Sequence, residues 1–353
     1  MIQMSTLRKR VAIGNLIIGS GFPVRVESML KNPITDIEAC RKEIDLLAEE
    51  GCELLRVAFP NINCLPYLRD ILQFSKVPIM ADIHFDFKLA LAALETGCMA
   101  IRINPGNMPK EGLVDIVNLA KERKAVIRIG SNSGSLSNVQ VRQSSGNKAK
   151  ALFLAVKEQL QMLEDMGFED IILSCKSTSI TETVNANLLL SKHFPKYPLH
   201  IGITEAGVMP DGLVKSAAGM ALLLTQGLGD TMRISLSAPA VEEVKAGYAL
   251  LRSLGLRKKG VEIISCPTCG RKHLDVAKIV EDISPLLKGL PDGLVVAVMG
   301  CEVNGPREAK EADVGIAGTP NGIVIFKKGK VVEQIDSHDF GIEKVSAIIR
   351  ELL

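Results

Sequence analysis

Three cysteines in the C-terminal third of the sequence have the types and spacing of a metal site. Cys266 and Cys269 form a Cys-x₂-Cys pair within EIISCPTCGR, and Cys301 follows an apolar run in VMGCEVNGPREA. This short gap lets both thiolates of the pair reach one metal centre, and the Pro and Gly residues beside the cysteines are typical of turns. We therefore predict that these three residues bind a metal ion or an iron–sulphur cluster.

A fourth ligand would decide which metal binds, and the residues leave two possibilities open. His273 would complete a Cys-x₂-Cys-x₃-His set with Cys301, which is typical of structural zinc. A carboxylate, either Glu302 or Glu308, would instead favour an iron–sulphur cluster with one weakly held iron, because a hard oxygen ligand is displaced more readily than a thiolate. The spacing alone does not separate the two.

A second set of polar residues stands where apolar runs end in the N-terminal two-thirds of the chain. Five of its members are the cations Arg56, Arg102, Arg128, Lys176 and Arg233. The others are Glu27, Ser28, Asp82, His84, Asn104, Asn132, Thr204, Glu205 and Ser235. Cations gathered at one place repel each other unless they bind an anion, and the fork of an arginine matches a phosphate group. The set therefore predicts a phosphorylated substrate, while the structural alternative pairs each cation with a carboxylate, chiefly Asp82 or Glu205.

Two residues of this set are candidates for proton transfer. His84, in ADIHFD, lies within reach of Asp82 by its spacing and either transfers a proton or binds phosphate. Glu205, in ITEAG, stays ionised among cations unless a bound substrate desolvates it. We take Glu205 as the candidate catalytic acid or base.

The elements that would bring this set together are βα units. From residue 24 to about residue 254, short β-branched runs alternate with longer patterns of helical period, which is typical of a parallel sheet. The expected strands are residues 23–28, 54–59, 78–83, 100–104, 125–130, 171–175, 199–204 and 231–236. Eight such units predict an α/β fold, a closed (β/α)₈ TIM barrel, in which the carboxyl ends of the strands face the active site.

Three local patterns add detail to this barrel. Residues 11–19 carry Gly-Asn between two apolar pieces and predict a hairpin that plugs the lower end of the barrel. Residues 37–50 predict a helix capped by Thr35 or Asp36, with Leu46 on its apolar face. Residues 131–148 are rich in Ser, Asn and Gly and predict a long loop.

The pattern changes near GLRKKG, residues 255–260, where Gly and charged residues indicate a linker. We expect residues 1–258 to form the barrel, as the substrate domain, and residues 259–353 to form a smaller α+β domain that holds the cysteines. A helix over residues 274–288, several strands and a terminal helix are expected in this second domain.

The bulk properties exclude several classes of protein. The 353 residues carry a net charge of only +2, with Lys and Arg spread along the chain, so neither a nucleic acid nor a membrane is an expected partner. The N-terminus lacks the apolar core of a signal peptide, and no apolar run reaches the length of a membrane span, so we expect a cytoplasmic protein. Eight cysteines in a large cytoplasmic chain favour metal binding or catalysis over disulphides.

Several motifs together resemble the family of bacterial 4-hydroxy-3-methylbut-2-enyl diphosphate synthases. They are ADIHFD, RINPGN, IRIG followed by N-x-GSL, ITEAG, SCPTCGR and GC-x-VNGP-x-EA, and the likeness runs nearly end to end. The resemblance implies a [4Fe–4S] cluster with ligands at Cys266, Cys269, Cys301 and Glu308, and so selects a carboxylate over His273.

The same resemblance implies a reaction and partners. The enzyme would open and dehydrate 2-C-methyl-D-erythritol 2,4-cyclodiphosphate reductively, giving 4-hydroxy-3-methylbut-2-enyl diphosphate in the non-mevalonate isoprenoid pathway. Reduced flavodoxin or ferredoxin would supply single electrons. The family's homodimer places the cluster domain of one subunit over the barrel mouth of the other.

Matched motif by motif, the resemblance also implies which residues line the substrate site. They are Arg56, Asp82, His84, Arg102, Asn104, Arg128, Asn132, Lys176, Thr204, Glu205, Arg233 and Ser235. The chain departs from the family at Glu27, where Gln is usual, and at Arg307, where NGPGEA normally has Gly beside Glu308.

Two other functions compete with this interpretation. One is a zinc-stabilised barrel enzyme of aldolase or pterin-synthase type without redox chemistry. The other makes the C-terminal domain an electron-carrier or interaction module.

Overall fold

The computed structural model describes residues 7–104, 112–303, 305, 309–339 and 341–352. The chain divides into two compact units, Met1–Arg257 and Lys258–Leu353, and each has its own hydrophobic core. No helix in the described ranges combines the length and the apolar character that crossing a membrane requires.

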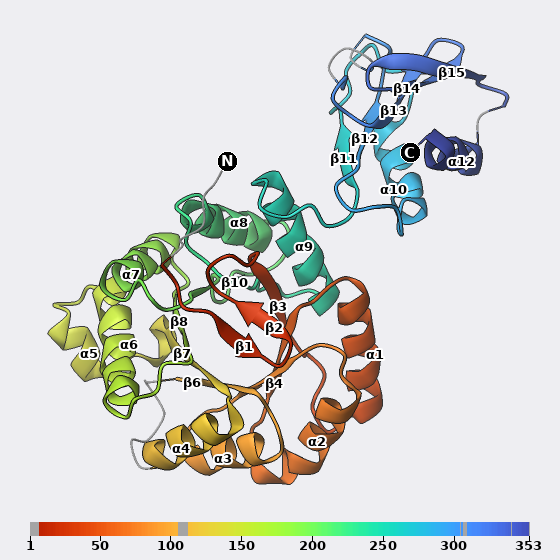
Figure 1. Ribbon diagram of the computed structural model, residues 1–353. Coiled ribbons are helices and arrows are strands. Elements are labelled where there is room, and N and C mark those ends of the chain that lie inside the picture. Colours follow the sequence, from red (N-terminus) through yellow and green to blue (C-terminus); the bar gives the residue numbers. More distant parts are fainter. Residues whose placement is uncertain (1–6, 105–111, 304, 306–308, 340, 353) are drawn as a thin grey trace. The chain divides into compact units, whose positions relative to one another are not determined.

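The first unit is a parallel barrel of eight strands surrounded by helices (Figure 1). The strands are β3 (Arg25–Met29), β4 (Leu54–Ala58), β5 (Ile79–Asp82), β6 (Ala100–Ile103), β7 (Val126–Asn132), β8 (Ile171–Lys176), β9 (His200–Ile201) and β10 (Thr231–Met232). They pair in the order β8-β7-β6-β5-β4-β3-β10-β9, and a parallel bridge between Leu173 and Leu199 joins the two ends of the sheet. Each strand overlaps one predicted run, so the predicted barrel is confirmed, although β9 and β10 are only two residues long.

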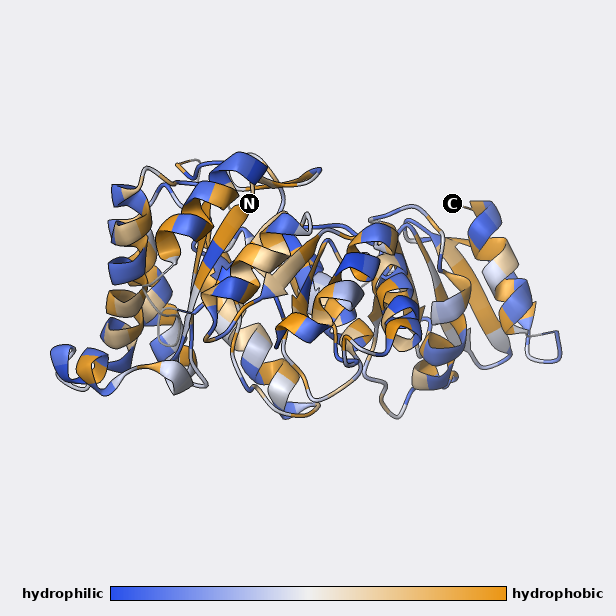
Figure 2. Ribbon diagram, turned by 90° about the horizontal axis from the view of Figure 1, so that it is seen from below, coloured by the Kyte–Doolittle hydropathy of each residue, from blue (hydrophilic) through white to orange (hydrophobic). Residues whose placement is uncertain are grey.

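Amphipathic helices cover the outside of the barrel. They are α1 (Ile37–Glu49), α2 (Leu65–Phe74), α3 (Phe87–Glu95), α4 (Leu113–Arg123), α5 (Asn138–Gln143), α6 (Lys148–Asp165), α7 (Ile180–His193), α8 (Asp211–Leu224) and α9 (Ala240–Ser253), with 3₁₀ turns η1 (Ile62–Cys64) and η2 (Ser133–Ser135). Figure 2 shows hydrophobic and hydrophilic residues alternating along the helices, as expected where one face packs on a sheet. Asp36 caps α1 by accepting a hydrogen bond from the Ala39 N–H at 3.0 Å. Leu46 is 55% exposed, so its predicted place on the apolar face of α1 was wrong.

The inward-facing residues of five barrel strands change from apolar to polar or charged along the strand. A hairpin of β1 (Val11–Ile13) and β2 (Leu16–Ile18) packs on residues at the amino ends of five strands. These residues are Leu54, Met80, Ala100, Val126 and Ile172. Two positions further along the same strands stand Arg56, Asp82, Arg102, Arg128 and Ser174. Because side chains alternate along a strand, both sets point inward, and the hairpin plugs the lower end as predicted.

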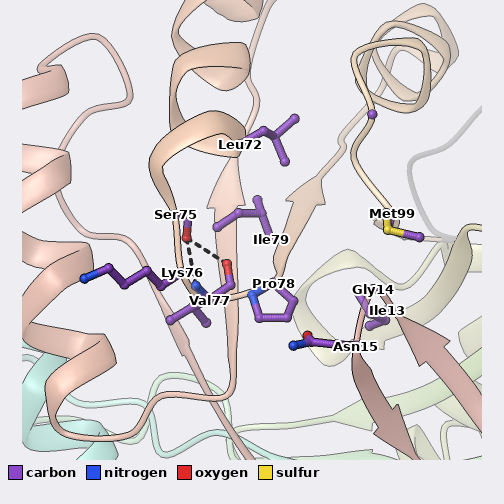
Figure 3. Close-up of a pocket in the computed structure, with 11 residues that line it drawn as sticks. Ile13, Gly14, Asn15, Leu72, Ser75, Lys76, Val77, Pro78, Ile79 and Met99 are labelled. Atoms are coloured by element: carbon purple, nitrogen blue, oxygen red, sulfur yellow. Dashed lines mark hydrogen bonds between the residues drawn. The ribbon is translucent and has the colours of Figure 1, made fainter.

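A pocket of about 250 Å³ lies beside this hairpin (Figure 3). Gly14 and Asn15 of the hairpin turn line it together with the segment that leads into β5. In that segment the Ser75 hydroxyl donates to the Val77 carbonyl at 2.7 Å and accepts from the Val77 N–H at 3.2 Å. The described residues that line this pocket include no carboxylate, histidine or cysteine. The charged side chains of the barrel gather instead at its opposite end.

The predicted long loop over residues 131–148 was wrong. Strand β7 continues to Asn132, η2 and α5 follow, and α6 begins at Lys148. Ser137 and Gln140 form a capping box at the start of α5, in which each side chain hydrogen-bonds the backbone of the other residue. The Ser-x-x-Gln spacing was the helix signal that the high polarity of this segment obscured.

The second unit is a small α+β domain, as predicted. Its sheet has the order β11 (Glu262–Ser265), β12 (Val295–Met299), β13 (Val314–Thr319), β14 (Gly322–Lys327) and β15 (Lys330–Asp336), with helices α10 (Val276–Leu286) and α12 (Ile342–Leu352). Strands β11 and β12 are parallel neighbours, with Ser265 paired to Val298. Their carboxyl ends therefore open at the same edge of the sheet, which brings Cys266 and Cys301 to one place.

The plug generates a stability prediction. Replacing Ile18 by Ala should lower the free energy of unfolding by about 2–5 kcal/mol, because Ile18 is fully buried and its truncation leaves a cavity under the strands. The matched control is Ile17→Ala, since Ile17 is on the other face of β2 and only half-buried. Urea unfolding of the full chain, followed by circular dichroism, measures both. Equal losses for the two variants would contradict the plug.

Candidate active site

A polar cavity of about 140 Å³ lies at the carboxyl ends of the barrel strands. Its lining residues are Arg56, Asp82, His84, Arg102, Arg128, Gly130, Asn132, Ser174, Lys176, His200, Thr204, Arg233 and Ser235. Strands β4 to β10 or the turns that follow them supply all of these residues. The alternation of the strands therefore sets the chemistry of the cavity, since it turns these side chains toward the barrel axis.

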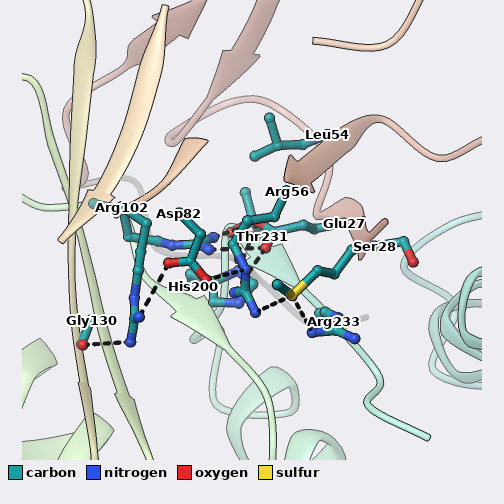
Figure 4. Close-up of polar contacts among 12 residues, drawn as sticks. Glu27, Ser28, Leu54, Arg56, Asp82, Arg102, Gly130, His200, Thr231 and Arg233 are labelled. Carbon is teal, nitrogen blue, oxygen red and sulfur yellow. Dashed lines mark hydrogen bonds and ion pairs between the residues drawn. The ribbon is translucent and has the colours of Figure 1, made fainter. Parts of the chain in front are cut away.

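The Asp82 carboxylate joins the cations of two neighbouring strands (Figure 4). Its oxygens lie 3.3 Å from Arg56 Nε, 3.2 Å from Arg102 Nη1 and 3.6 Å from His84 Nε2. Burial alone would raise the pKa of Asp82, but Arg56, His84 and Arg102 outweigh it and hold this pKa below its usual range. Asp82 is therefore an ionised hydrogen-bond acceptor and not a proton donor.

Glu27 forms a buried ion pair with Arg128. Arg128 Nη2 donates to Glu27 Oε1 at 3.0 Å, and Arg128 Nη1 donates to Oε2. Arg56 Nη1 approaches Oε1 within 3.6 Å. Burial would raise the pKa of Glu27, but the charges of Arg128 and Arg56 lower it further than burial raises it. Glu27 and Arg128 are each 1% exposed, so both charges depend on this contact.

Glu243 on helix α9 holds the side chain of Arg233 from outside the sheet. Its carboxylate accepts from Arg233 Nε at 3.1 Å and from Nη2 at 3.2 Å. The Leu236 N–H and the Ser28 hydroxyl donate to the same carboxylate at 3.0 and 3.3 Å, and Lys31 Nζ lies 2.9 Å away. The bidentate contact fixes the orientation in which Arg233 meets the cavity.

Lys176 and His200 meet at the wall of the cavity. Lys176 Nζ lies 2.8 Å from His200 Nε2, and His200 Nδ1 lies 2.8 Å from the Thr231 hydroxyl. Burial, followed by the charges of Arg56 and Arg128, lowers the pKa of Lys176 well below its ordinary value. Burial, followed by the basic side chains around the ring, does the same to the pKa of His200. The imidazole is therefore held neutral.

Most of the residues predicted to bind substrate are brought together in this cavity. They are Arg56, Asp82, His84, Arg102, Arg128, Asn132, Lys176, Thr204, Arg233 and Ser235. Asn104 does not line it: its side chain is buried and donates to the Ser135 hydroxyl at 2.8 Å, which anchors η2. Glu205 is exposed in the turn after β9, with a φ of 50°, and does not line the cavity either. The carboxylates that contact the cations are thus Asp82, Glu27 and Glu243, and not the predicted Glu205.

Three lining residues, Gly130, Ser174 and His200, were not predicted from the sequence. A signal for His200 was present, because His200, Gly202 and Thr204 alternate along LHIGIT and Thr204 had already been selected. Glu243 was also missed. It falls on the buried face of α9 at helical spacing from Ala240 and Gly247, but nothing local shows that a carboxylate there meets Arg233.

The three cysteines line a separate pocket of about 170 Å³ in the second unit. Cys266 follows β11, Cys269 follows a Thr268 with a φ of 63°, and Cys301 follows Gly300 at the end of β12. The Gly300 N–H donates to Cys266 Sγ at 3.0 Å, a contact that stabilises negative charge on sulphur. His273 does not line the pocket, and Arg307 and Glu308 lie outside the described residues.

Among the described side chains, no three ligands of the His, Cys, Asp or Glu type converge as they would around a single metal ion. Three thiols around one pocket nevertheless form a donor set that fits an iron–sulphur cluster, whose irons are held by cysteine thiolates and whose size keeps those thiolates further apart than one ion would.

The Glu27–Arg128 pair generates a second stability prediction. Glu27→Leu should lower the free energy of unfolding by about 3–5 kcal/mol, because it leaves Arg128 buried without a countercharge. Glu27→Gln is the matched control, since its amide oxygen still accepts from the guanidinium, and its loss should be clearly smaller. Urea unfolding of both variants measures the difference. A Leu variant as stable as the Gln variant would mean that Arg128 has another compensating partner.

Known proteins match the chain along nearly its whole length. Two family models match it, the "GcpE TIM-barrel domain" over residues 8–248 and the "GcpE protein C-terminal domain" over residues 262–351. A protein of Lawsonia intracellularis is 44% identical over 348 residues, which are 97% of each chain. A protein of Clostridium perfringens is 40% identical over 345 residues, which are 98% of each chain. Both bear the name 4-hydroxy-3-methylbut-2-en-1-yl diphosphate synthase (flavodoxin).

These matches confirm the resemblance that the motifs indicated. Identity of this extent over both units is enough to assign a family. The chain belongs to the GcpE family, that of the 4-hydroxy-3-methylbut-2-en-1-yl diphosphate synthases.

Proposed function

We propose that this protein is an oxidoreductase of isoprenoid synthesis that converts 2-C-methyl-D-erythritol 2,4-cyclodiphosphate into 4-hydroxy-3-methylbut-2-enyl diphosphate. The names of the relatives support the product and an electron supply from flavodoxin. Ferredoxin is the alternative donor. We further propose that the protein is a homodimer in the cytoplasm and that it acts in the non-mevalonate pathway.

The observation that carries the proposal is the excess of cations in the barrel cavity. Four arginines contact three carboxylates, and Lys176 contacts none among the described residues, so the wall retains positive charge for an anionic ligand. Arg56 in particular has hydrogen-bonding capacity to spare. Its buried Nε lies 3.3 Å from Asp82 Oδ2 without forming a hydrogen bond in the described part of the chain, and its Nη2 faces the weak acceptor Met29 Sδ at 3.0 Å. A diphosphate offers oxygens that can accept hydrogen bonds from Arg56.

The cysteine pocket supports the redox part of the proposal. Cys266, Cys269 and Cys301, with Glu308 as fourth ligand, would hold a [4Fe–4S] cluster. When bound, the cluster supplies single electrons and an iron whose oxygen ligand can be exchanged. A structural zinc site would require His273, which stands outside the pocket wall. This weakens the zinc-enzyme alternative.

The barrel residues divide the remaining work between binding and proton transfer. Arg102 is held by Asp82 and by the Gly130 carbonyl at 2.9 Å, so it can orient a phosphate without moving. Asp82 stays ionised and cannot supply the proton that dehydration needs. Glu205 remains the candidate donor, because it adjoins Thr204 of the cavity wall and its exposed carboxyl can exchange protons with solvent.

Removing a proposed cluster ligand should remove the cluster. After anaerobic purification, Cys269→Ala should lose the brown colour and most of its iron and sulphide, because the site would keep only two thiolates. Cys64→Ala is the control: Cys64 is a buried cysteine of the barrel, and its variant should keep full iron content. Colourless wild-type protein with one zinc per chain would favour the zinc enzyme instead.

Removing the proposed proton donor should slow turnover without affecting the cluster. Glu205→Gln should lower kcat by roughly 100-fold or more with a chemical reductant, which is the usual effect of losing a general acid. Glu122→Gln, an exposed carboxylate change on α4, should leave kcat unaltered. The assay is anaerobic conversion of the cyclodiphosphate with identification of the product. Full turnover by Glu205→Gln would remove this role, and no product from wild type would overturn the function.

A further inference from the structure

We infer that Lys176 is an uncharged amine in the substrate-free barrel and that its Nζ takes up a proton from solvent when the dianionic cyclodiphosphate binds. One N–H bond forms at Nζ, and the protonation of His200 does not change. The inference rests on the proposed function, because it concerns the charge balance of the same cavity.

Lys176 differs from the four arginines of the cavity in its partners. The carboxylate contacts of the arginines are Asp82 with Arg56 and Arg102, Glu27 with Arg128 and Arg56, and Glu243 with Arg233. Within the described residues, Lys176 forms no ion pair with a carboxylate, and its hydrogen-bond partner is the His200 imidazole. Lys176 is only 8% exposed, so water does little to stabilise a charge there. An ammonium at this position would be uncompensated.

His200 is placed to serve the amine in either protonation state. Its ring is fully buried, with the Thr231 hydroxyl 2.8 Å from Nδ1 and Glu27 Oε2 3.5 Å from Nδ1. Both of these oxygens can accept, so we assign the ring proton to Nδ1 and the lone pair to Nε2. An amine and an ammonium can both donate to that lone pair. Lys176 can therefore gain a proton without any rearrangement of its neighbours.

The charges that face Lys176 come from four elements. They are Arg56 on β4, Arg128 on β7, Arg233 after β10 and Glu27 on β3, beside the neutral His200 on β9. Three cations against one anion disfavour an additional positive charge. Burial and these cations lower the pKa of Lys176, and Glu27 offsets only part of that effect.

A bound dianion reverses this balance. Two negative charges in the cavity that Lys176 lines favour its charged form, as opposite charges do at contact distance. Both phosphoryl groups of a cyclic diphosphate are strong acids, so the ligand itself has no group that titrates near neutral pH. Any proton exchanged on binding therefore belongs to the protein.

Calorimetry of cyclodiphosphate binding tests the inference. The full-length, cluster-loaded protein is titrated anaerobically, without reductant, at one pH in buffers of different ionisation enthalpy. The slope of the observed enthalpy against the buffer enthalpy counts the protons exchanged. Wild type should take up about one proton per bound ligand.

Four variants locate that proton. Lys176→Met, which cannot titrate, and Lys176→Arg, which is always charged, should both reduce the slope to near zero. His200→Gln and His84→Gln each remove an imidazole, and both should keep the uptake. Lys150→Met, on the exposed surface of α6, is the control for losing a lysine and should bind like wild type.

The outcomes separate this inference from the function. Tight wild-type binding with a slope of zero would overturn the inference and leave the function standing. If His200→Gln lost the proton uptake while Lys176→Met retained it, the proton would belong to the imidazole, and the inference about Lys176 would also be overturned. Absence of any wild-type binding would contradict the proposed function itself.

Discussion

The burial of arginine side chains inside the barrel is the constraint on which the cavity at the carboxyl ends of the strands depends. A guanidinium stays charged at any pH at which proteins fold, and a buried charge without a partner costs several kcal/mol. Arg128 therefore needs Glu27, and Arg102 needs Asp82. Arg233 obtains Glu243 from a helix on the outside of the sheet. These carboxylates both stabilise the fold and hold each guanidinium in one orientation, so the cavity is organised before any ligand arrives.

The two candidate sites follow from one property of parallel strands. Neighbouring parallel strands end at the same edge, so residues just beyond them gather without any further device. In the barrel this rule assembles the cations, and in the small sheet it brings Cys266 and Cys301 together after β11 and β12. The chemistry differs because the side chains differ, while the geometry that gathers them is the same.

Features that rest on a regular alternation of apolar and polar residues over a short stretch could be predicted from the sequence. The eight strands, the plug hairpin and the place of Lys176 at a strand end all follow from alternation along short runs. The partners of the charges could not be predicted, because Glu243 reaches Arg233 only through the packing of α9 on the sheet. Glu205 shows the limit from the other side: it follows Thr204 directly in the sequence, but it is exposed in a left-handed turn and does not line the cavity. Polarity also misled, since the Ser-rich segment after β7 contains the short helix α5.

The plug hairpin has a consequence for how this enzyme can vary. It concentrates apolar packing at the lower ends of the strands, two residues away from the layer that meets the ligand. Selection for heat resistance can therefore act on one layer while selection for catalysis acts on the other, with few shared side chains. A directed-evolution library for a more heat-stable enzyme would accordingly vary the hairpin and the amino ends of the strands that it contacts. The charged layer would be kept unchanged.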